Sequence, residues 1–171
     1  MTFQPSSGET PTADGGRSRH ALVIATFFFV GYVPRAPGTI ASLLTCSIWV
    51  LPIFLGSTLI QRVLVSLLIF GVGVWAANRS LAAFKEHSDP GAIVIDEVAG
   101  QTLALASCQN FLSLVAAFLL FRIFDILKPG PIGWLDRKIK GGLGIMIDDM
   151  AAGLCALGVL LLSHYFWPNV F

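Results

Sequence analysis

The sequence predicts an all-α protein that is embedded in a membrane, with about five membrane-embedded helices and a charged site at one face of the bilayer. The first observation behind this prediction is composition, because 55% of the 171 residues are hydrophobic and only 12% are charged. A soluble domain usually carries about 25% charged residues. The second observation is that the charge-poor stretches are long enough to span a bilayer, which needs roughly 20 apolar residues per helix. A lone strand cannot satisfy its backbone in lipid, so each stretch is predicted to be helical.

The predicted organisation is a short tail followed by one helical domain. Residues 1–20 are rich in Ser, Thr, Gly and Pro and are predicted to be a disordered tail, and residues 21–171 form the domain. The apolar run 21–33 is expected to lie on the membrane or dip into it, because no small-residue cleavage site follows it. The predicted helices are 39–55, 63–77, 92–107, 111–127 and 144–167. The stretch 92–107 is short, so it either crosses the membrane or forms a re-entrant hairpin with 111–127.

The third observation is the distribution of charge when the chain is threaded through the bilayer five times. All ten acidic residues and ten of the eleven basic residues then fall on one face, and only Arg62 falls on the other. The positive-inside rule makes the charged face cytoplasmic. The aromatic run Tyr165–Trp167 fits an interfacial belt on the opposite face. The net charge is +1, so no overall basic field indicates a nucleic-acid partner.

Carboxylates from three predicted helix ends reach one level of the membrane. Acidic groups at the edge of apolar spans are costly and usually functional, and several together need a cation or protons. Oxygen ligands favour a hard ion, and Mg²⁺ is the one expected in the cytoplasm. The residues concerned are Asp96, Glu97, Asp125, Asp148 and Asp149. A structural interpretation stays open for each pair: Asp148 and Asp149 would favour the dipole of a first helical turn, and Arg122 would pair with Asp125.

Two further segments carry groups that suit anions. Thr39 opens an apolar helix soon after Arg35, and a helix N-terminus beside an arginine is a ready anion site. The alternative is a proline-bounded loop in which Thr39 is only the N-cap. The loop 128–144 is rich in Lys and Arg, which at a membrane surface attract anionic headgroups or only set the topology. The spacing of Asp136 and Lys140 predicts a short interfacial helix in this loop.

Three blocks of the sequence resemble the phosphatidylglycerophosphatase A family of bacterial membrane lipid phosphatases. They are Pro34–Thr39 (PRAPGT), Ile93–Gly100 (IVIDEVAG) and the long block from Phe121 (FRIFDILKP) to Gly153. The resemblance covers about 30–160. It implies Mg²⁺-dependent removal of the terminal phosphate of phosphatidylglycerophosphate, which gives phosphatidylglycerol in phospholipid biosynthesis. It also implies a multi-pass protein of the bacterial cytoplasmic membrane, with the active site facing the cytoplasm.

Site residues can be carried over from this resemblance one by one. It implies catalytic roles for Asp96, Glu97, Asp125 and Asp149. It implies metal ligands at Asp96, Glu97, Asp125, Asp148 and Asp149. It implies substrate binding by Arg35, Thr39, Arg122 and Lys128. The chain departs from the family at Glu86–Gly91, where a His-rich stretch is common, so no role is expected for His87.

The sequence lacks the motifs of several other phosphate-transferring enzymes. It has no P-loop, no Cys-x₅-Arg, no D-x-D and no pattern for a His nucleophile. These absences leave metal-assisted attack on phosphorus, either by water or by a carboxylate. The rival hypothesis is a membrane ion carrier or transporter, in which intramembrane acids bind the transported cation. Acids spread through the membrane depth would favour it, whereas here they gather at one edge with basic residues beside them.

Overall fold

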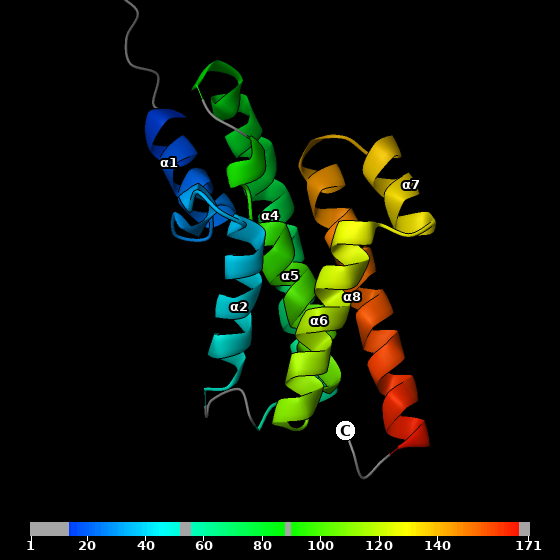
Figure 1. The fold of residues 1–171 in the computed structure, drawn as a ribbon. Helices are drawn as coiled ribbons and strands as arrows, with labels where there is room; N and C mark the ends of the chain where they lie inside the picture. The colour runs from blue at the N-terminus through cyan, green and yellow to red at the C-terminus, as the bar shows by residue number, and fades with distance from the viewer. Residues whose placement is uncertain (1–13, 52–55, 88–89, 168–171) are drawn as a thin grey trace, which may run out of the picture.

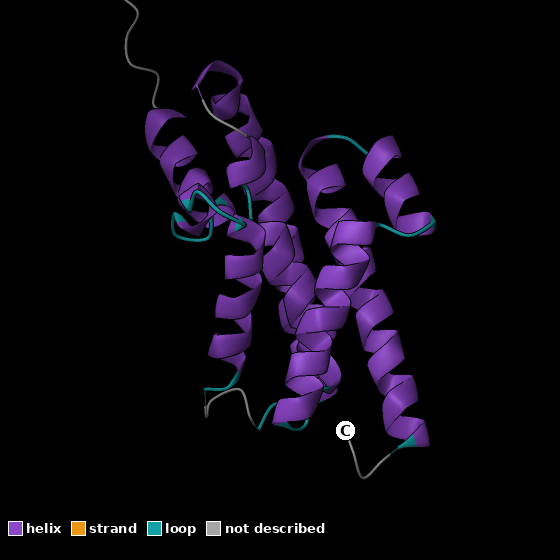
Figure 2. Ribbon diagram, in the orientation of Figure 1, coloured by secondary structure: helices purple, strands orange, loops and turns teal. Residues whose placement is uncertain are grey.

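The computed structural model describes residues 14–51, 56–87 and 90–167, and in them every regular element is a helix (Figures 1 and 2). The predicted all-α class is therefore confirmed for the described residues. In chain order the elements are α1 (Asp14–Ala25), η1 (Val30–Tyr32), α2 (Pro37–Trp49), α4 (Leu59–His87), η2 (Pro90–Ala92), α5 (Ile95–Ala104), η3 (Leu105–Ser107), α6 (Phe111–Leu127), α7 (Pro131–Lys138) and α8 (Gly141–Phe166).

Two of these helices are long and apolar enough to cross a membrane. They are Leu59–Leu81 within α4 and Gly141–Phe166, which is the whole of α8. Only 17% of the apolar window in α4 is buried, so most of its side chains face outward, which favours a lipid environment over a soluble core. Helices α2, α5 and α6 have 13, 10 and 17 residues, fewer than the roughly 20 of a full span. Of the about five membrane-embedded helices predicted, two therefore have spanning length in the described residues, and the number five stays a prediction.

The centre of the bundle is the short helix α5, which packs against α2, α4, α6 and α8 (Figure 1). All its residues are buried except Asp96 and Glu97, which are half-buried. Glycines let α8 approach it closely. A Cβ at Gly100 would lie 2.5 Å from the Asp149 carbonyl oxygen, and a Cβ at Gly153 would collide with the carbonyl of Gly100. Small residues at such crossings allow the tight packing that membrane bundles rely on.

Both ends of the α5–η3 segment are fixed by long-range hydrogen bonds. At the start, the Val94 N–H donates to the Ala25 carbonyl at 2.9 Å. At the far end, Arg62 Nη1 of α4 donates to the carbonyls of Leu105 at 3.3 Å and Cys108 at 2.6 Å. Helix C-termini leave carbonyls without partners, and a cation there satisfies them. The single basic residue predicted on the far face therefore supports the buried helix.

After η3 the chain reverses and returns through α6, whose bounds match the prediction 111–127. Asn110 and Ser113 form a reciprocal capping box at its start. At its end Lys128 adopts a left-handed conformation with φ 42°, and α7 follows. The predicted interfacial helix was misplaced, because α7 ends at Lys138 and Lys140 is the N-cap of α8. The helix α7 instead places Lys138 Nζ 4.7 Å from the centroid of the Trp134 ring.

The N-terminal segment forms a helix and then a sharp turn. Helix α1 begins at Asp14, so it enters the predicted tail of residues 1–20, and the part of that tail at 1–13 lies outside the described residues. It ends at Ala25, and the three residues 27–29, all Phe, have φ of 45°, 55° and 70°. The run 21–33 therefore turns back at the end of the bundle that holds the start of α2 (Figure 1). Tyr165–Trp167 are exposed at the opposite end, as predicted for an aromatic belt.

Candidate active site

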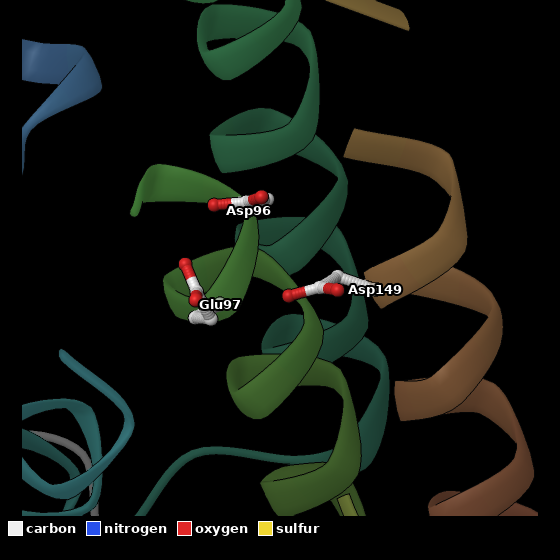
Figure 3. Close-up of side chains that lie close together, drawn as sticks. All are labelled: Asp96, Glu97 and Asp149. Carbon is white, nitrogen blue, oxygen red and sulfur yellow. The ribbon is translucent and has the colours of Figure 1, made fainter. Parts of the chain in front are cut away.

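Three carboxylates meet where the first turn of α5 faces α8. One oxygen each from Asp96, Glu97 and Asp149 lies within 4.8 Å of the others, and Asp149 reaches from α8 toward the other two (Figure 3). We call these three residues the carboxylate trio. Asp96 and Glu97 occupy the first turn of α5, where the helix dipole favours negative charge. Helix α8 begins at Gly141, so Asp148 and Asp149 lie in its third turn, and the first-turn interpretation is wrong for that pair.

The trio has unmet hydrogen-bonding capacity. Asp96 Oδ1, Glu97 Oε2 and Asp149 Oδ2 are buried and have no hydrogen-bond partner within the described part of the chain. Buried polar atoms are normally paired, and clustered carboxylates repel one another unless a cation or protons intervene. Carboxylate oxygens alone form the donor set that Mg²⁺ prefers. The residues present therefore fit a hard divalent cation.

The next layer of the site comes from the last turns of α6. Arg122 Nη1 lies 2.7 Å from Asp125 Oδ2, and the two side chains are 15% and 13% exposed. The predicted i,i+3 ion pair is thus confirmed. Asp125 is also close enough to Glu97 and Asp149 to interact with both electrostatically. Since Arg122 Nε has no hydrogen-bond partner among the described residues, the guanidinium retains a donor beside the trio.

Lys128 links α6, α7 and α8. Its Nζ donates to Asp136 Oδ1 at 2.7 Å and to Asp148 Oδ2. Burial alone would lower the pKa of Lys128, but the hydrogen bonds to the two carboxylates outweigh it and hold that pKa above its ordinary value. The hydrogen bond from Lys128 likewise lowers the pKa of Asp136. Asp148 and Asp149 are about 100° apart around their helix, so the first holds Lys128 while the second faces the trio.

The start of α2 adjoins the trio through Gly38. A Cβ at Gly38 would collide with the Glu97 carboxylate, so the absence of a side chain there lets α2 lie against Glu97. Arg35 is exposed just before the helix and Thr39 is half-buried in its first turn. The structure therefore brings the predicted anion-binding segment to the same end of the bundle as the acids.

One polar residue of this region was missed by the sequence reasoning. Gln101 is fully buried one turn after Glu97, and neither atom of its amide has a hydrogen-bond partner in the described residues. An uncharged polar side chain four residues from Glu97 would share its face of α5. The four-residue spacing of Glu97 and Gln101 within a mostly apolar stretch was therefore the signal that could have pointed to Gln101 as a site residue.

The arrangement defines a class of protein: an apolar helical bundle with an oxygen-ligand acidic site at one end, flanked by an arginine and a lysine suited to a phosphate. Residues 23–164 match the phosphatidylglycerophosphatase A family, and the chain belongs to that family. No solved structure matches the chain.

Three relatives have similar sequences along most of their length. The chain is 38% identical to phosphatidylglycerophosphatase A of Escherichia coli K12, over 98% of this chain and 97% of the relative. It is 37% identical to phosphatidylglycerophosphatase A of Haemophilus influenzae, over 84% of this chain and 88% of the relative. It is 34% identical to a Bacteroides thetaiotaomicron protein named "Putative phosphatidylinositol-3-phosphatase", over 84% of this chain and 93% of the relative.

Proposed function

We propose that the protein removes the terminal phosphate of phosphatidylglycerophosphate in a Mg²⁺-dependent reaction that yields phosphatidylglycerol. The observation that carries the proposal is the buried carboxylate trio with a cationic donor at its edge. The trio supplies oxygen ligands, and Arg122 and Lys128 supply donors for phosphate oxygens. Membership of a family named for this activity, together with two relatives of the same name, supports the choice of substrate.

The proposed setting is the bacterial cytoplasmic membrane, with α4 and α8 crossing it and the trio near the cytoplasmic surface. The uneven distribution of Lys and Arg supports this orientation, since within residues 14–51, 56–87 and 90–167 Arg62 alone belongs to the other end of the bundle. The acyl chains of the substrate would stay in the leaflet. The phosphate monoester, at the far end of the headgroup, would reach the trio from the interface.

Each group of the site has a role in the proposed chemistry. Asp96, Glu97 and Asp149 would hold Mg²⁺, with Asp125 beside them. A bound Mg²⁺ would neutralise charge on the phosphate and polarise its P–O bonds. Arg122 would bind phosphate oxygens through its free Nε, and Lys128 through its ammonium group. Asp148 would keep Lys128 in position, although the family resemblance also implies it as a metal ligand.

The displacement itself needs a nucleophile and a proton acceptor. We favour a water molecule that attacks phosphorus while a carboxylate of the site takes its proton; direct attack by a carboxylate is the alternative. The P–O bond to the glycerol breaks, and the leaving oxygen receives a proton.

The ion-carrier hypothesis gains no support, because the trio, Asp125 and Asp148 all gather at one end of the bundle.

The direct test is phosphate release from phosphatidylglycerophosphate by the purified protein in detergent. We expect release with Mg²⁺, its loss with a chelator and its return when Mg²⁺ is restored. An absence of release with Mg²⁺ would refute the proposed activity. Phosphatidylinositol 3-phosphate, the substrate in the name of the Bacteroides relative, is the comparison substrate. Equal rates on both lipids would show that the site recognises the phosphate monoester rather than the glycerol headgroup.

A further inference from the structure

An apolar groove runs between α2 and α6 on the side of the bundle. Its cavity volume is about 300 Å³, and it is lined by three residues of α2 between 43 and 47, by Val50 just after α2, and by four residues of α6 between 111 and 118. None of these residues is charged. Leu43 is 48% exposed and Phe111 is 78% exposed, so the groove opens to the surroundings of the bundle.

The same two helices that form the groove also flank the trio. The start of α2 lies beside Glu97 at Gly38, and α6 carries Asp125 near its C-terminus. Figure 1 shows α2 and α6 on either side of α5, running in opposite directions. A molecule lying along the groove therefore points toward the carboxylates at one end.

The distance of the groove from the trio along the two helices can be compared with the thickness of one leaflet of a bilayer. With a rise of 1.5 Å per residue, Ser47 lies about 13 Å along α2 from Gly38, and Val115 lies about 15 Å along α6 from Asp125. The hydrocarbon of one leaflet is about 15 Å thick, half of the roughly 30 Å core. With the trio at the interface, the groove thus begins within the hydrocarbon of the leaflet that would hold the substrate. Its far end, at Val50 and Phe111, lies about 18 Å and 21 Å from the same two residues, just beyond the middle of the bilayer.

The far end of the groove has a different character. An adjoining cavity of about 420 Å³ shares Val50, Phe111 and Leu114 with the groove but is also lined by Arg62 and Asn110. The apolar groove therefore ends at a polar cavity, at the end of the bundle opposite the trio. An apolar chain that enters from the trio has a defined length of groove to occupy.

We propose that this groove binds an acyl chain of the phospholipid substrate while the headgroup phosphate reaches the trio, an inference that rests on the proposed function. A chain that leaves lipid for the groove gains little hydrophobic free energy, because both surroundings are apolar. The groove instead contributes packing contacts and fixes the direction of the substrate. Its occupation therefore affects kcat/KM for long-chain substrate more than for short-chain substrate.

The test fills the groove from each side and compares two substrates in the same detergent micelles. Ser47→Trp and Val115→Trp place an indole in the groove from α2 and from α6. We expect each to lower kcat/KM for dioleoyl phosphatidylglycerophosphate by about tenfold or more, the scale of a lost fit in an apolar pocket. The dihexanoyl substrate, whose chains are too short to fill the groove, should change by less than about twofold.

The matched controls are Leu44→Trp and Leu119→Trp, on the same helices and outside the groove. We expect them to leave both substrates unchanged. Equal losses on both substrates, or no loss on either, would overturn the groove assignment. A photoactivatable acyl chain gives a second measurement on the unaltered protein: cross-links should map to 43–50 and 111–118, and cross-links spread evenly over α4 and α8 would also overturn it. If the unaltered protein releases phosphate from neither lipid, it is the proposed function that fails.

Discussion

Gly38 of α2 lies directly against Glu97 of α5, with no room for even a Cβ between them. This contact joins the segment that carries Arg35 to the helix that carries two of the three clustered carboxylates. It also explains why the short block PRAPGT belongs to the same site as the IDE sequence some 60 residues later in the chain. The position of the Glu97 carboxylate therefore depends on a residue without a side chain.

Gly38→Ala should impair activity without unfolding the protein. The added methyl group must displace Glu97, and a misplacement on the order of 1 Å can cost about 100-fold in rate. Phosphate release should fall on this scale while the thermal midpoint changes by only a few degrees. Gly158→Ala is the matched control, because a Cβ at Gly158 in α8 meets nothing within 4 Å and should leave activity intact. Full activity of Gly38→Ala would show that Glu97 does not need its observed position.

Asp148 and Asp149 should give different phenotypes although they are neighbours. Asp149→Asn removes one of the three proposed Mg²⁺ ligands, whereas Asp148→Asn weakens the hold on Lys128. Supporting residues around a metal site typically contribute about 10- to 100-fold, so Asp148→Asn should cost about tenfold, and a lost ligand should cost more than about 100-fold. Titration of activity with Mg²⁺ should show a large rightward shift for Asp149→Asn only. Equal shifts for both variants would place Asp148 among the metal ligands.

Much of the site could be predicted from the sequence because its helices are delimited by strong local signals. The apolar run 111–127 coincides with α6, because Asn110 caps the helix at its start and Lys128 ends it, so the level of Asp125 followed from the run itself. The start of α8 was ambiguous, because the glycines at 141, 142 and 144 allow several starting points. Starting at Gly141 rather than Gly144 places Asp148 and Asp149 in the third turn. Which of these two carboxylates contacts Lys128 and which faces the trio then depends on tertiary packing.

Other features were beyond sequence reasoning for clear physical reasons. The left-handed residues 27–29 oppose the preference of bulky side chains, so no local rule would place a turn there. The contact of Arg62 with the end of η3 joins residues more than 40 positions apart and depends on how α5 docks. From charge counting, Arg62 was only the exception to an asymmetric distribution. The structure shows it as a tertiary support of the central helix.

The Lys128–Asp136 pair predicts a small dependence of stability on pH. The folded-state pKa of Asp136 is lowered, so its contribution is present above its unfolded pKa, near 3.9, and is lost as pH falls through the lower folded value. The folded-state pKa of Lys128 is raised, so its contribution is present below its unfolded pKa, near 10.4, and is lost as pH rises through the higher folded value. Both side chains are a third or more exposed, so the pair contributes only about 0.2–1 kcal/mol. Asp136→Asn should therefore lower the thermal midpoint slightly at pH 7, and its effect should disappear as the pH falls through the folded-state pKa of Asp136. A decrease that stays the same throughout an acid titration would indicate that the charge is not responsible.

Arg62→Met should destabilise the bundle from the end opposite the trio. The guanidinium donates to the carbonyls of Leu105 and Cys108, and hydrogen bonds from a charged donor contribute about 1.5–3 kcal/mol. The free energy of unfolding in detergent should fall by about 2–3 kcal/mol, because the Cys108 carbonyl loses its charged donor and the Leu105 carbonyl keeps only the hydrogen bond from the Cys108 N–H. The Mg²⁺ dependence of phosphate release by the protein that remains folded should be unchanged, since Arg62 lies at the far end of α5–η3 from the trio. Arg137→Met removes a charge from an exposed position of α7 and should leave the free energy of unfolding unchanged. If the two variants were equally stable, the hydrogen bonds from Arg62 would not be what holds the central helix, and its packing against α2, α4, α6 and α8 would be sufficient.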